Sequence, residues 1–373
     1  MNKNVKKCIF HVPMELSVNP QSGSELRPVK MIQAFRNLGY YVEIISGDSS
    51  ARRSKIARIK KNILQGNKYE FIYSESSTMP TLLTDNDHLP RHPFLDFSFF
   101  KFCRQHDIKI GLFYRDAHWK FPLYCQDIKK WIPWVTIPLY KYDLHMYEKL
   151  VDILYVPSNQ FMDYFNLNIP WKQLPPGCVS AISDERVVAN EVYPLQLFYV
   201  GGIQLHYEIV SLIKAVNSTS HIEMTLCCHK DAWDKYQYLY KGDLCDRIKI
   251  IHKNAAELTK YYQVADVGCL CFKKSEYMDL AMPIKMFEYI GNGLPIIATK
   301  GTAAAEFIES NDIGWTVEYS VEAIRKLLNY LDYNRVEVLE KKKNVLKIVS
   351  NNTWEARAST VVNDLSPFGT KKG

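Results

Sequence analysis

The stretch from Met282 to Thr299 constrains the fold more than any other part of the chain. Its first half has the apolar spacing of a short helix, and Pro283 suits the first helical position, where a missing N–H costs nothing. Gly291 and Gly293 are residues that end helices. Residues 295–299, Pro-Ile-Ile-Ala-Thr, are typical of a short buried strand. A helix followed so closely by a buried strand predicts a unit of an α/β sheet.

Two charged residues of this helix lie on one face. Lys285 and Glu288 are three positions apart, whereas Ile284, Phe287 and Ile290 line another face. A lysine in the first turn meets the positive end of the helix dipole, which is unfavourable unless an anion binds there, as phosphates do. Glu288 is placed to accept hydrogen bonds from a ribose diol. The pair predicts a nucleotide site, and the alternative is an ordinary charged pair on a solvated face.

Strand-like and helix-like segments alternate along the rest of the chain. Strands are predicted over residues 7–12, 41–45, 70–73, 108–114 and 151–156, and then over 194–202, 223–228, 248–251, 266–271 and 296–298. A length of 373 residues favours two domains, and Leu174-Pro-Pro-Gly177 is a candidate linking turn. We therefore expect an α/β protein with two doubly wound Rossmann-like domains, whose strand ends face a shared cleft.

Composition excludes several classes of protein. With 47% hydrophobic and 23% charged residues the chain is globular, not disordered. It has no apolar run of about 18 residues and no signal-peptide core at its start, so we expect neither a spanning helix nor secretion. The nine cysteines lack framework spacing. Cys227-Cys228 and Cys269-x-Cys271 suit buried strands better than metal ligation, and a reducing cytoplasm is the expected location.

Positive charge is concentrated in the first half. Residues 1–180 contain 24 basic and 16 acidic residues, whereas the remainder has 23 and 24. Six basic residues and no acidic one lie in the segment 51–64, where Ile56, Ile59 and Ile63 form an apolar stripe. This segment is predicted either to lie on an anionic membrane or to pack on its own sheet with a solvated basic face.

Two glycine-containing turns follow predicted strands. Gly23 and Ser24 lie where the first helix begins, and their backbone N–H groups are placed for an anion, although a simple helix cap is the alternative. Gly201 and Gly202 follow the first strand of the second half and would let a pyrophosphate approach the backbone. A third glycine is missing there, which disfavours NAD.

A further candidate site follows the strand that ends near residue 114. Asp116 and His118 enter a loop at the carboxyl end of this strand, where a carboxylate beside an imidazole is suited to general base catalysis, and Arg115 is expected to hold Asp116 ionised. Most Asp-x-His triplets in loops are caps or surface groups. Downstream, residues 131–140 are rich in Trp and apolar residues, which suits core packing, a lipid tail or a membrane interface.

The string Pro283-Ile-Lys-Met-Phe-Glu-Tyr289, followed by Gly-Leu-Pro, closely resembles the donor-nucleotide helix of GT-B glycosyltransferases, in particular the bacterial family 4-like enzymes. The resemblance implies an acceptor-binding domain over residues 1–180, completed by a crossover helix at about 352–373. It also implies a donor-binding domain over 190–351. Gly23 and Ser24 match the glycine loop of that acceptor-binding domain.

The chain departs from these enzymes at two places. They have an arginine just after the strand that precedes Gly201 and a lysine a little later, and both are absent, so Lys285 with Lys273 or Lys274 is expected to neutralise the diphosphate. Many of them carry two glutamates seven residues apart. Glu288 fits the second, but the first falls at Leu280, which puts a retaining mechanism in doubt.

The expected function is metal-independent hexosyl transfer from a nucleotide-diphosphate sugar to a glycan acceptor, with a lipid-linked saccharide in surface polysaccharide biosynthesis as the expected acceptor. No cofactor is expected, and the enzyme would be cytoplasmic and peripheral on the inner face of the cell membrane. One alternative is a nucleotide-sugar epimerase of the same fold. Another is a non-catalytic basic protein that binds membranes; nucleic-acid binding is disfavoured because no such motif is present. The donor base, the sugar, the acceptor and the stereochemistry stay open.

Overall fold

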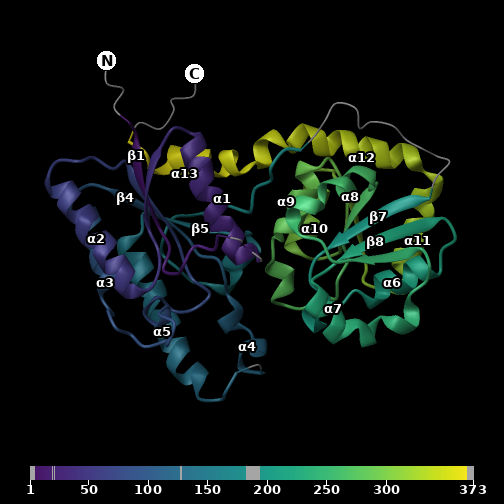
Figure 1. Ribbon diagram of the computed structural model, residues 1–373, viewed down its shortest axis with the longest axis horizontal. Helices are drawn as coiled ribbons and strands as arrows, with labels where there is room; N and C mark the ends of the chain where they lie inside the picture. The colour runs from purple at the N-terminus through teal and green to yellow at the C-terminus, as the bar shows by residue number, and fades with distance from the viewer. Residues whose placement is uncertain (1–4, 19, 21, 127, 182–193, 368–373) are drawn as a thin grey trace. The chain divides into compact units, whose positions relative to one another are not determined.

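The computed structural model describes residues 5–18, 20, 22–126, 128–181 and 194–367, and it divides into two compact units (Figure 1). Unit 1 comprises Met1–Pro176 and Trp354–Gly373, and unit 2 comprises Gly177–Thr353. The sequence analysis placed these divisions at about residues 180 and 352. Residues 190–193 and 368–373, which it assigned to the second domain and to the crossover helix, lie outside the described residues.

Unit 1 is built on a parallel six-stranded sheet in the order β2-β1-β3-β4-β5-β6. Its strands are β1 (Lys7–His11), β2 (Tyr41–Ile45), β3 (Phe71–Glu75), β4 (Lys109–Phe113), β5 (Ile153–Val156) and β6 (Trp171–Gln173). The chain reverses direction across the sheet between β1 and β3, and such a switch point is where open α/β sheets bind ligands. The sequence analysis missed β6, a short strand at the sheet edge with no apolar alternation.

Helices cover both faces of this sheet (Figure 1). On one face, α1 (Gly23–Asn37) packs against α13 (Trp354–Leu365), and both bury apolar side chains against β1, β3 and β5. The other face carries α2 (Ser49–Leu64), α3 (Leu95–Arg104) and α5 (Ile132–Leu150). Shorter helical segments are η1 (Thr81–Leu83), η2 (His118–Lys120), α4 (Pro122–Gln126) and η3 (Gln160–Tyr164). The C-terminal helix α13 is thus part of unit 1, because its apolar face completes the core over α1.

Unit 2 has a second parallel six-stranded sheet, in the order β12-β11-β10-β7-β8-β9. Its strands are β7 (Leu195–Val200), β8 (Ile222–Cys227), β9 (Ile248–Ile251), β10 (Val267–Leu270), β11 (Ile296–Thr299) and β12 (Gly314–Val317). Counted within the unit this is the order 6-5-4-1-2-3, the typical order of doubly wound sheets, with its switch point between β7 and β10. Only β12 was missed, since its residues are mostly half-exposed.

The helices of unit 2 follow the strands in alternation. They are α6 (Val210–Asn217), α7 (Lys230–Tyr236), α8 (Thr259–Val264), α9 (Ile284–Gly291), α10 (Ala303–Ser310), α11 (Val321–Tyr333) and α12 (Arg335–Ile348), with 3-10 turns η4 (Leu205–Tyr207), η5 (Gln237–Leu239), η6 (Lys241–Asp243), η7 (Ala255–Glu257), η8 (Met278–Leu280) and η9 (Ser350–Asn352). Helix α6 packs against α11, and α9 packs against α12. Buried Cys227, Cys228, Cys269 and Cys271 belong to one apolar cluster around this sheet, which explains their spacing without a metal.

The burial of residues in α2 decides between the two interpretations of the basic segment 51–64. The apolar stripe of Ile56, Ile59 and Ile63 is buried against the body of unit 1, so it is not available to a membrane. Arg52 is 1% exposed, and its guanidinium donates two hydrogen bonds of 3.0 Å to the carboxylate of buried Asp96. Of the two alternatives left open for this segment, the structure shows the second, packing on its own unit. Its apolar residues pack on its own unit because that burial stabilises the fold.

One buried carboxyl group of unit 1 makes the fold sensitive to pH. Asp143 on α5 accepts a hydrogen bond of 2.7 Å from the N–H of Thr81, while its other oxygen has no hydrogen-bond partner. Burial raises the pKa of Asp143 from its ordinary value of 3.8 to about 7. The folded state therefore binds more protons than the unfolded state between these values, and stability falls as the pH rises through this window.

We expect wild-type protein to lose about 2 to 3 kcal/mol of unfolding free energy between pH 5 and pH 8 relative to Asp143→Asn. The asparagine keeps an acceptor for Thr81 but carries no charge at either pH. Denaturant unfolding of the two proteins across this range measures the difference. Parallel pH curves would show that Asp143 does not titrate in this window.

Candidate functional site

The predicted nucleotide helix is α9. It begins at Ile284, one residue later than predicted, and Pro283 is its N-cap, with extended backbone (ψ 136°). Gly293, with a φ of 71°, takes the left-handed conformation that reverses the chain after the helix, and the N–H of Leu294 then reaches back to the carbonyl of Tyr289. Glycine adopts this backbone conformation at the lowest cost in free energy. The chain then enters β11 directly after the turn. Residues 282–299 thus form the predicted helix, turn and strand.

Lys285 and Glu288 meet on the outer side of this helix. The Lys285 ammonium donates to Glu288 Oε2 at 2.7 Å, and the hydroxyl of Tyr262 on α8 donates to the same oxygen, also at 2.7 Å. Both charged side chains are partly exposed, at 32% and 24%. Burial and the Glu288 carboxylate raise the pKa of Tyr262 far above its ordinary value, so the phenol stays a donor. The second oxygen of Glu288 is left for further hydrogen bonds, as a ribose diol requires.

The neighbouring Tyr289 was part of the sequence motif, but only the structure shows its role. Strands β7 and β10 pair at residues 197–198 and 267–268 and then separate, which is how a switch point opens. The buried Tyr289 hydroxyl lies between the separated strands, where it accepts from the N–H of Val200 at 3.0 Å and donates to the carbonyl of Phe198 at 3.1 Å. A Cβ on Gly268 would lie 2.6 Å from the Tyr289 ring, so the glycine makes room for it.

Gly201 and Gly202 form the turn that follows β7. The hydroxyl of Tyr199 donates to the carbonyl of Gly202 at 2.6 Å, which pins the turn. A side chain at Gly202 would meet Gln204 at 2.6 Å, and one at Gly201 would meet the Tyr199 hydroxyl at 3.2 Å. The glycines therefore keep the backbone open at the carboxyl end of β7, next to the switch point, as a backbone anion site requires.

Lys273 lies at the carboxyl end of β10, on the other side of the same switch point. Its side chain is 66% exposed and its ammonium is 3.8 Å from Glu208, whose carbonyl accepts the N–H of Lys273 at 3.0 Å. Lys274 instead lies 3.7 Å from Asp279. Leu280, seven residues before Glu288, is buried, so no carboxylate occupies that position. The glycine turn and Lys273 thus flank one switch point in unit 2.

The residues predicted for catalysis come together in unit 1. Asp116 Oδ1 accepts the N–H of His118 at 2.9 Å, and Asp116 Oδ2 is 3.1 Å from His118 Nδ1. The other ring nitrogen, Nε2, is 3.4 Å from the hydroxyl of Tyr140 on α5. Asp116 and His118 are 15% and 26% exposed, so both are reachable from solvent. This arrangement suits Asp116 as a general base, with the His118 imidazole either sharing or orienting the proton that the carboxylate takes up.

Arg115 was expected to hold Asp116 ionised, which stays a prediction; the structure shows Arg115 in an ion pair with Glu75. Its guanidinium donates to Glu75 at 2.9 Å and to the carbonyl of Ser24 at 2.7 Å. Glu75 is fully buried at the end of β3 and also lies 3.4 Å from Arg27 on α1. Burial lowers the pKa of Arg115, which the adjacent Glu75 carboxylate opposes. Arg115 therefore ties the start of α1 to β3 and to the end of β4, through the buried Glu75 carboxylate and the Ser24 carbonyl.

Gly23 and Ser24 are the first two residues of α1, after the N-cap Ser22. Glu25 reaches back to the N–H of Ser22 at 3.3 Å, which completes a capping box. The structure thus supports the cap interpretation directly. The Ser24 carbonyl accepts a hydrogen bond from Arg115, the residue before Asp116. The first turn of α1 therefore lies beside the loop that carries Asp116.

One pattern bears on the expected absence of a metal. Asp85-Asn86-Asp87 is an Asp-x-Asp triplet, a pattern that can hold a divalent cation. Asp85 is buried and accepts both the N–H and the hydroxyl of Ser49 at 2.6 Å, whereas Asp87 pairs with exposed Arg91. Within the described residues no three His, Cys, Asp or Glu side chains are grouped to hold a metal. The triplet is thus accounted for by structural hydrogen bonds.

The C-terminal part of the chain matches a known family. Residues 268–359 match the family model described as "Glucosyltransferase 3-like, C-terminal domain", a range that includes Lys285 and Glu288. The curated protein "Glucosyltransferase 3" of Streptococcus parasanguinis is 38% identical over 73 residues, which are 20% of this chain and 21% of that protein. The match therefore spans about a fifth of the length of the curated relative.

Solved structures are similar over almost the whole chain. HepE of Anabaena, solved in complex with UDP, has a TM-score of 0.65 at 11% identity, covering 96% of this chain and 99% of that one. Sucrose-phosphate synthase of Thermosynechococcus elongatus has a TM-score of 0.63 at 13% identity, covering 95% and 97%. WaaG, a glycosyltransferase involved in lipopolysaccharide biosynthesis, has a TM-score of 0.60 at 13% identity, covering 96% and 100%.

At these identities the similarity establishes the fold. The chain has two parallel doubly wound units, as the GT-B glycosyltransferases do, and the predicted fold class is confirmed. The resemblance drawn from residues 283–295 is confirmed as well, since the family match covers that string. In the described residues, no helix is long and apolar enough to cross a bilayer.

Proposed function

We propose that this protein is a glycosyltransferase that moves a sugar of the hexose type from a nucleoside-diphosphate sugar to a glycan acceptor, without a metal ion. The observation that carries the proposal is the Lys285–Glu288–Tyr262 group on α8 and α9. Lys285 and Glu288 lie within the segment 268–359 that matches a glucosyltransferase family, on a sheet with the typical doubly wound strand order. The short helix α9 therefore carries a cation for the phosphates of a nucleotide and a hydrogen-bond acceptor for its ribose hydroxyls.

Unit 2 would bind the donor. Glu288 accepts hydrogen bonds from the ribose hydroxyls, held in place by the Tyr262 phenol, while Lys285 leaves its contact with Glu288 to meet the diphosphate. The glycine turn at 201–202 supplies backbone N–H groups, and exposed Lys273 adds a second positive charge. The negative charge that develops on the departing diphosphate is then stabilised by fixed donors and a helix N-terminus, so no metal is required.

Unit 1 would bind the acceptor. The Asp116 carboxylate takes the proton of the attacking acceptor hydroxyl as the new bond to the anomeric carbon forms and the bond to the diphosphate breaks. His118 orients this carboxylate. The absence of a carboxylate at Leu280 favours this inverting route. We further propose a lipid-linked saccharide as acceptor and a site of action at the inner face of the cell membrane, which the basic surplus of residues 1–180 supports.

Binding of nucleoside diphosphates tests the proposal. We expect UDP, GDP or ADP to raise the thermal unfolding midpoint of the full chain, because a ligand at a hundred times its dissociation constant stabilises the folded state by about 2.7 kcal/mol. Glu288→Gln should weaken the binding of that nucleotide by roughly 10- to 100-fold, the worth of hydrogen bonds to a charged acceptor. Isothermal titration of the two proteins gives the ratio.

A matched control is Glu322→Gln, which changes an exposed carboxylate on α11 of the same unit and should leave the affinity unchanged. A wild-type protein that no nucleoside diphosphate stabilises would contradict the proposed function. Unchanged affinity in Glu288→Gln would remove Glu288 from the site while leaving the function standing.

A further inference from the structure

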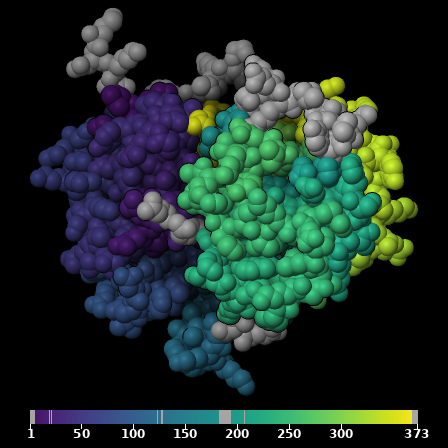
Figure 2. All heavy atoms as spheres, turned by 45° about the vertical axis from the view of Figure 1, so that its right-hand side comes forward, coloured from purple at the N-terminus to yellow at the C-terminus, as the bar shows by residue number. Residues whose placement is uncertain are grey.

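The outward face of α5 is unusually apolar in its first turns. Trp131, Trp134 and Val135 are 62%, 84% and 47% exposed, and exposed Pro138 continues the same face one turn later. This end of α5 and the loop before it extend away from the sheet of unit 1 (Figure 1), and the blue-teal part of the chain projects in the space-filling view (Figure 2). Two neighbouring exposed tryptophans on a projecting helix end are costly in water and indicate a binding surface.

Positive charge surrounds this apolar face. Lys129 and Lys130 precede the helix and Lys141 follows Pro138 along the face, and all three lysines are exposed. Between residues 128 and 141 the sequence has no acidic residue. Tryptophan prefers the boundary between lipid and water, and lysines beside it reach anionic headgroups. The charge of the surface is thus complementary to an anionic bilayer.

We infer that the outer face of α5, with Lys129, Lys130, Trp131, Trp134, Val135 and Lys141, is a docking surface that inserts into the interface of an anionic lipid bilayer. We call it the α5 face. The inference rests on the proposed function, in which the acceptor is lipid-linked and so lies at that interface. It replaces the segment 51–64, whose apolar stripe is buried.

The inner face of the same helix reaches the predicted catalytic loop. Tyr140, two positions beyond Pro138, is buried, stacks on Trp119 with ring centroids 5.0 Å apart, and approaches His118 Nε2 at 3.4 Å. One turn earlier, the hydroxyls of Thr136 and Tyr124 are 2.6 Å apart, and the Tyr124 ring lies 5.0 Å from that of His118. A bilayer against the α5 face would therefore lie about one helix diameter, roughly 10 Å, from the Asp116–His118 pair.

Vesicle sedimentation with the full chain tests the inference. We expect binding to vesicles of phosphatidylcholine with phosphatidylglycerol, weaker binding to phosphatidylcholine alone, and a decline as salt rises. Trp131→Ser/Trp134→Ser should lower the partition coefficient roughly tenfold or more. Lys129→Gln/Lys130→Gln/Lys141→Gln should lower it about a hundredfold on anionic vesicles only.

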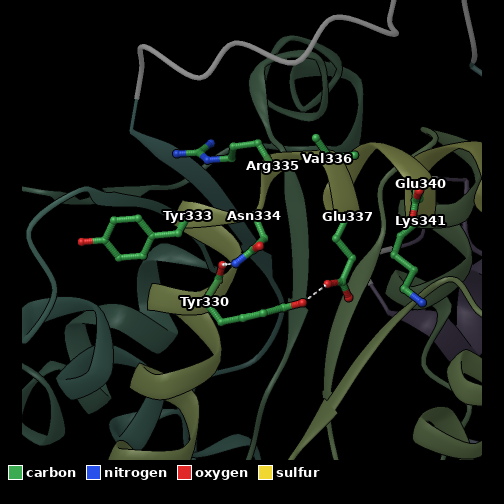
Figure 3. A pocket seen from close by; sticks show the side chains of 8 residues that line it. All are labelled: Tyr330, Tyr333, Asn334, Arg335, Val336, Glu337, Glu340 and Lys341. Atoms are coloured by element: carbon green, nitrogen blue, oxygen red, sulfur yellow. Dashed lines mark hydrogen bonds between the residues drawn. The ribbon is translucent and has the colours of Figure 1, made fainter.

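Unit 2 offers a matched control at the elbow between α11 and α12 (Figure 3). Tyr333 and Val336 are 87% and 62% exposed there, beside a hollow of about 530 Å³ that Glu337 and Glu340 also line. Arg335 and Lys341 line the same hollow, so its two acidic and two basic residues leave no positive surplus, and anionic lipid should bind there much less than at the α5 face. Tyr333→Ser/Val336→Ser should therefore bind vesicles as the wild type does. A second control, Arg53→Gln/Lys61→Gln, changes exposed charges of α2 and should lower binding much less than the α5 changes.

Two further measurements separate the possible failures. Brominated lipids should quench wild-type fluorescence, since Trp131 and Trp134 are two of the seven tryptophans, and this needs no variant to fold. Stabilisation of each variant by a nucleoside diphosphate should equal that of the wild type. Vesicle binding without any effect of nucleotides would contradict the proposed function and leave the docking surface standing.

Three results would overturn the inference itself. The first is wild-type vesicle binding by Trp131→Ser/Trp134→Ser. The second is a larger loss in the α2 control than in the α5 variants, which would assign binding to α2. The third is a wild-type dimer that this tryptophan variant converts to a monomer without lipid, which would show that a second copy of the chain covers the surface.

Discussion

Asp116→Asn is expected to lower the turnover of sugar transfer by roughly 10² to 10⁴-fold, the usual contribution of a general base. The substitution is nearly isosteric and keeps an acceptor for the His118 N–H, so the η2 turn that this contact caps should persist. Only the charge that takes the acceptor proton is lost. Nucleotide affinity should barely change, because in the proposal Asp116 meets the acceptor and not the donor.

The measurement is initial-rate kinetics with saturating donor, together with nucleotide titration on the same preparation. Asp163→Asn is a suitable control, since Asp163 is an exposed carboxylate of the same unit. Near-normal turnover would instead make Asp116 only the cap of its loop and would favour a retaining mechanism, which needs no protein base of this kind.

Lys285→Ala should lower the transfer rate by roughly 10² to 10³-fold, the effect of removing one donor that stabilises developing charge. The affinity for the nucleoside diphosphate should fall as well, because the same ammonium meets the diphosphate in the bound state. The fold should be retained: Lys285 is partly exposed, and Glu288 keeps its hydrogen bond from Tyr262. Single-turnover rates at saturating donor separate the effect on chemistry from the effect on binding.

Lys285→Arg and Lys326→Ala are informative companions. The arginine retains the charge and should recover part of the rate, whereas Lys326 is an exposed lysine of α11 in the same unit and its removal should have no effect. A lower melting temperature in Lys285→Ala with full activity per folded molecule would show that the lysine only supports α9 structurally.

The fold was predictable where periodicity and turn chemistry agree. Ten of the strands lie within two residues of their predicted bounds; eight of these are central strands, which are continuous apolar runs in parallel sheets. The two missed strands, β6 and β12, are edge strands with partly exposed side chains, so hydrophobicity carries little signal for them. The helix–turn–strand from Pro283 to Thr299 was predictable because Pro283 marks the start of the helix and Gly293 the turn after it.

The candidate site was only partly predictable. The closeness of Lys285 to Glu288 follows from helical spacing, and that of Asp116 to His118 from their proximity in the loop. Tyr262 was missed because it comes from α8, 26 residues away, and no spacing rule relates it to Glu288. The ion pair of Arg115 with Glu75 was missed for the same reason, since Glu75 is a neighbour only through the pairing of β3 with β4.

The sequence by itself determined the kind of structure: two series of buried strands, helices with one apolar face, and a charged pair at the first turn of α9. These depend on contacts between residues close along the chain. The tertiary structure alone decided which apolar residues of α2 and α5 stay exposed. In α2 the isoleucine stripe and Arg52 are buried, whereas in α5 the tryptophans remain exposed. Both helices are rich in apolar residues, and packing against the sheet, which joins distant segments, determines what is left for a partner.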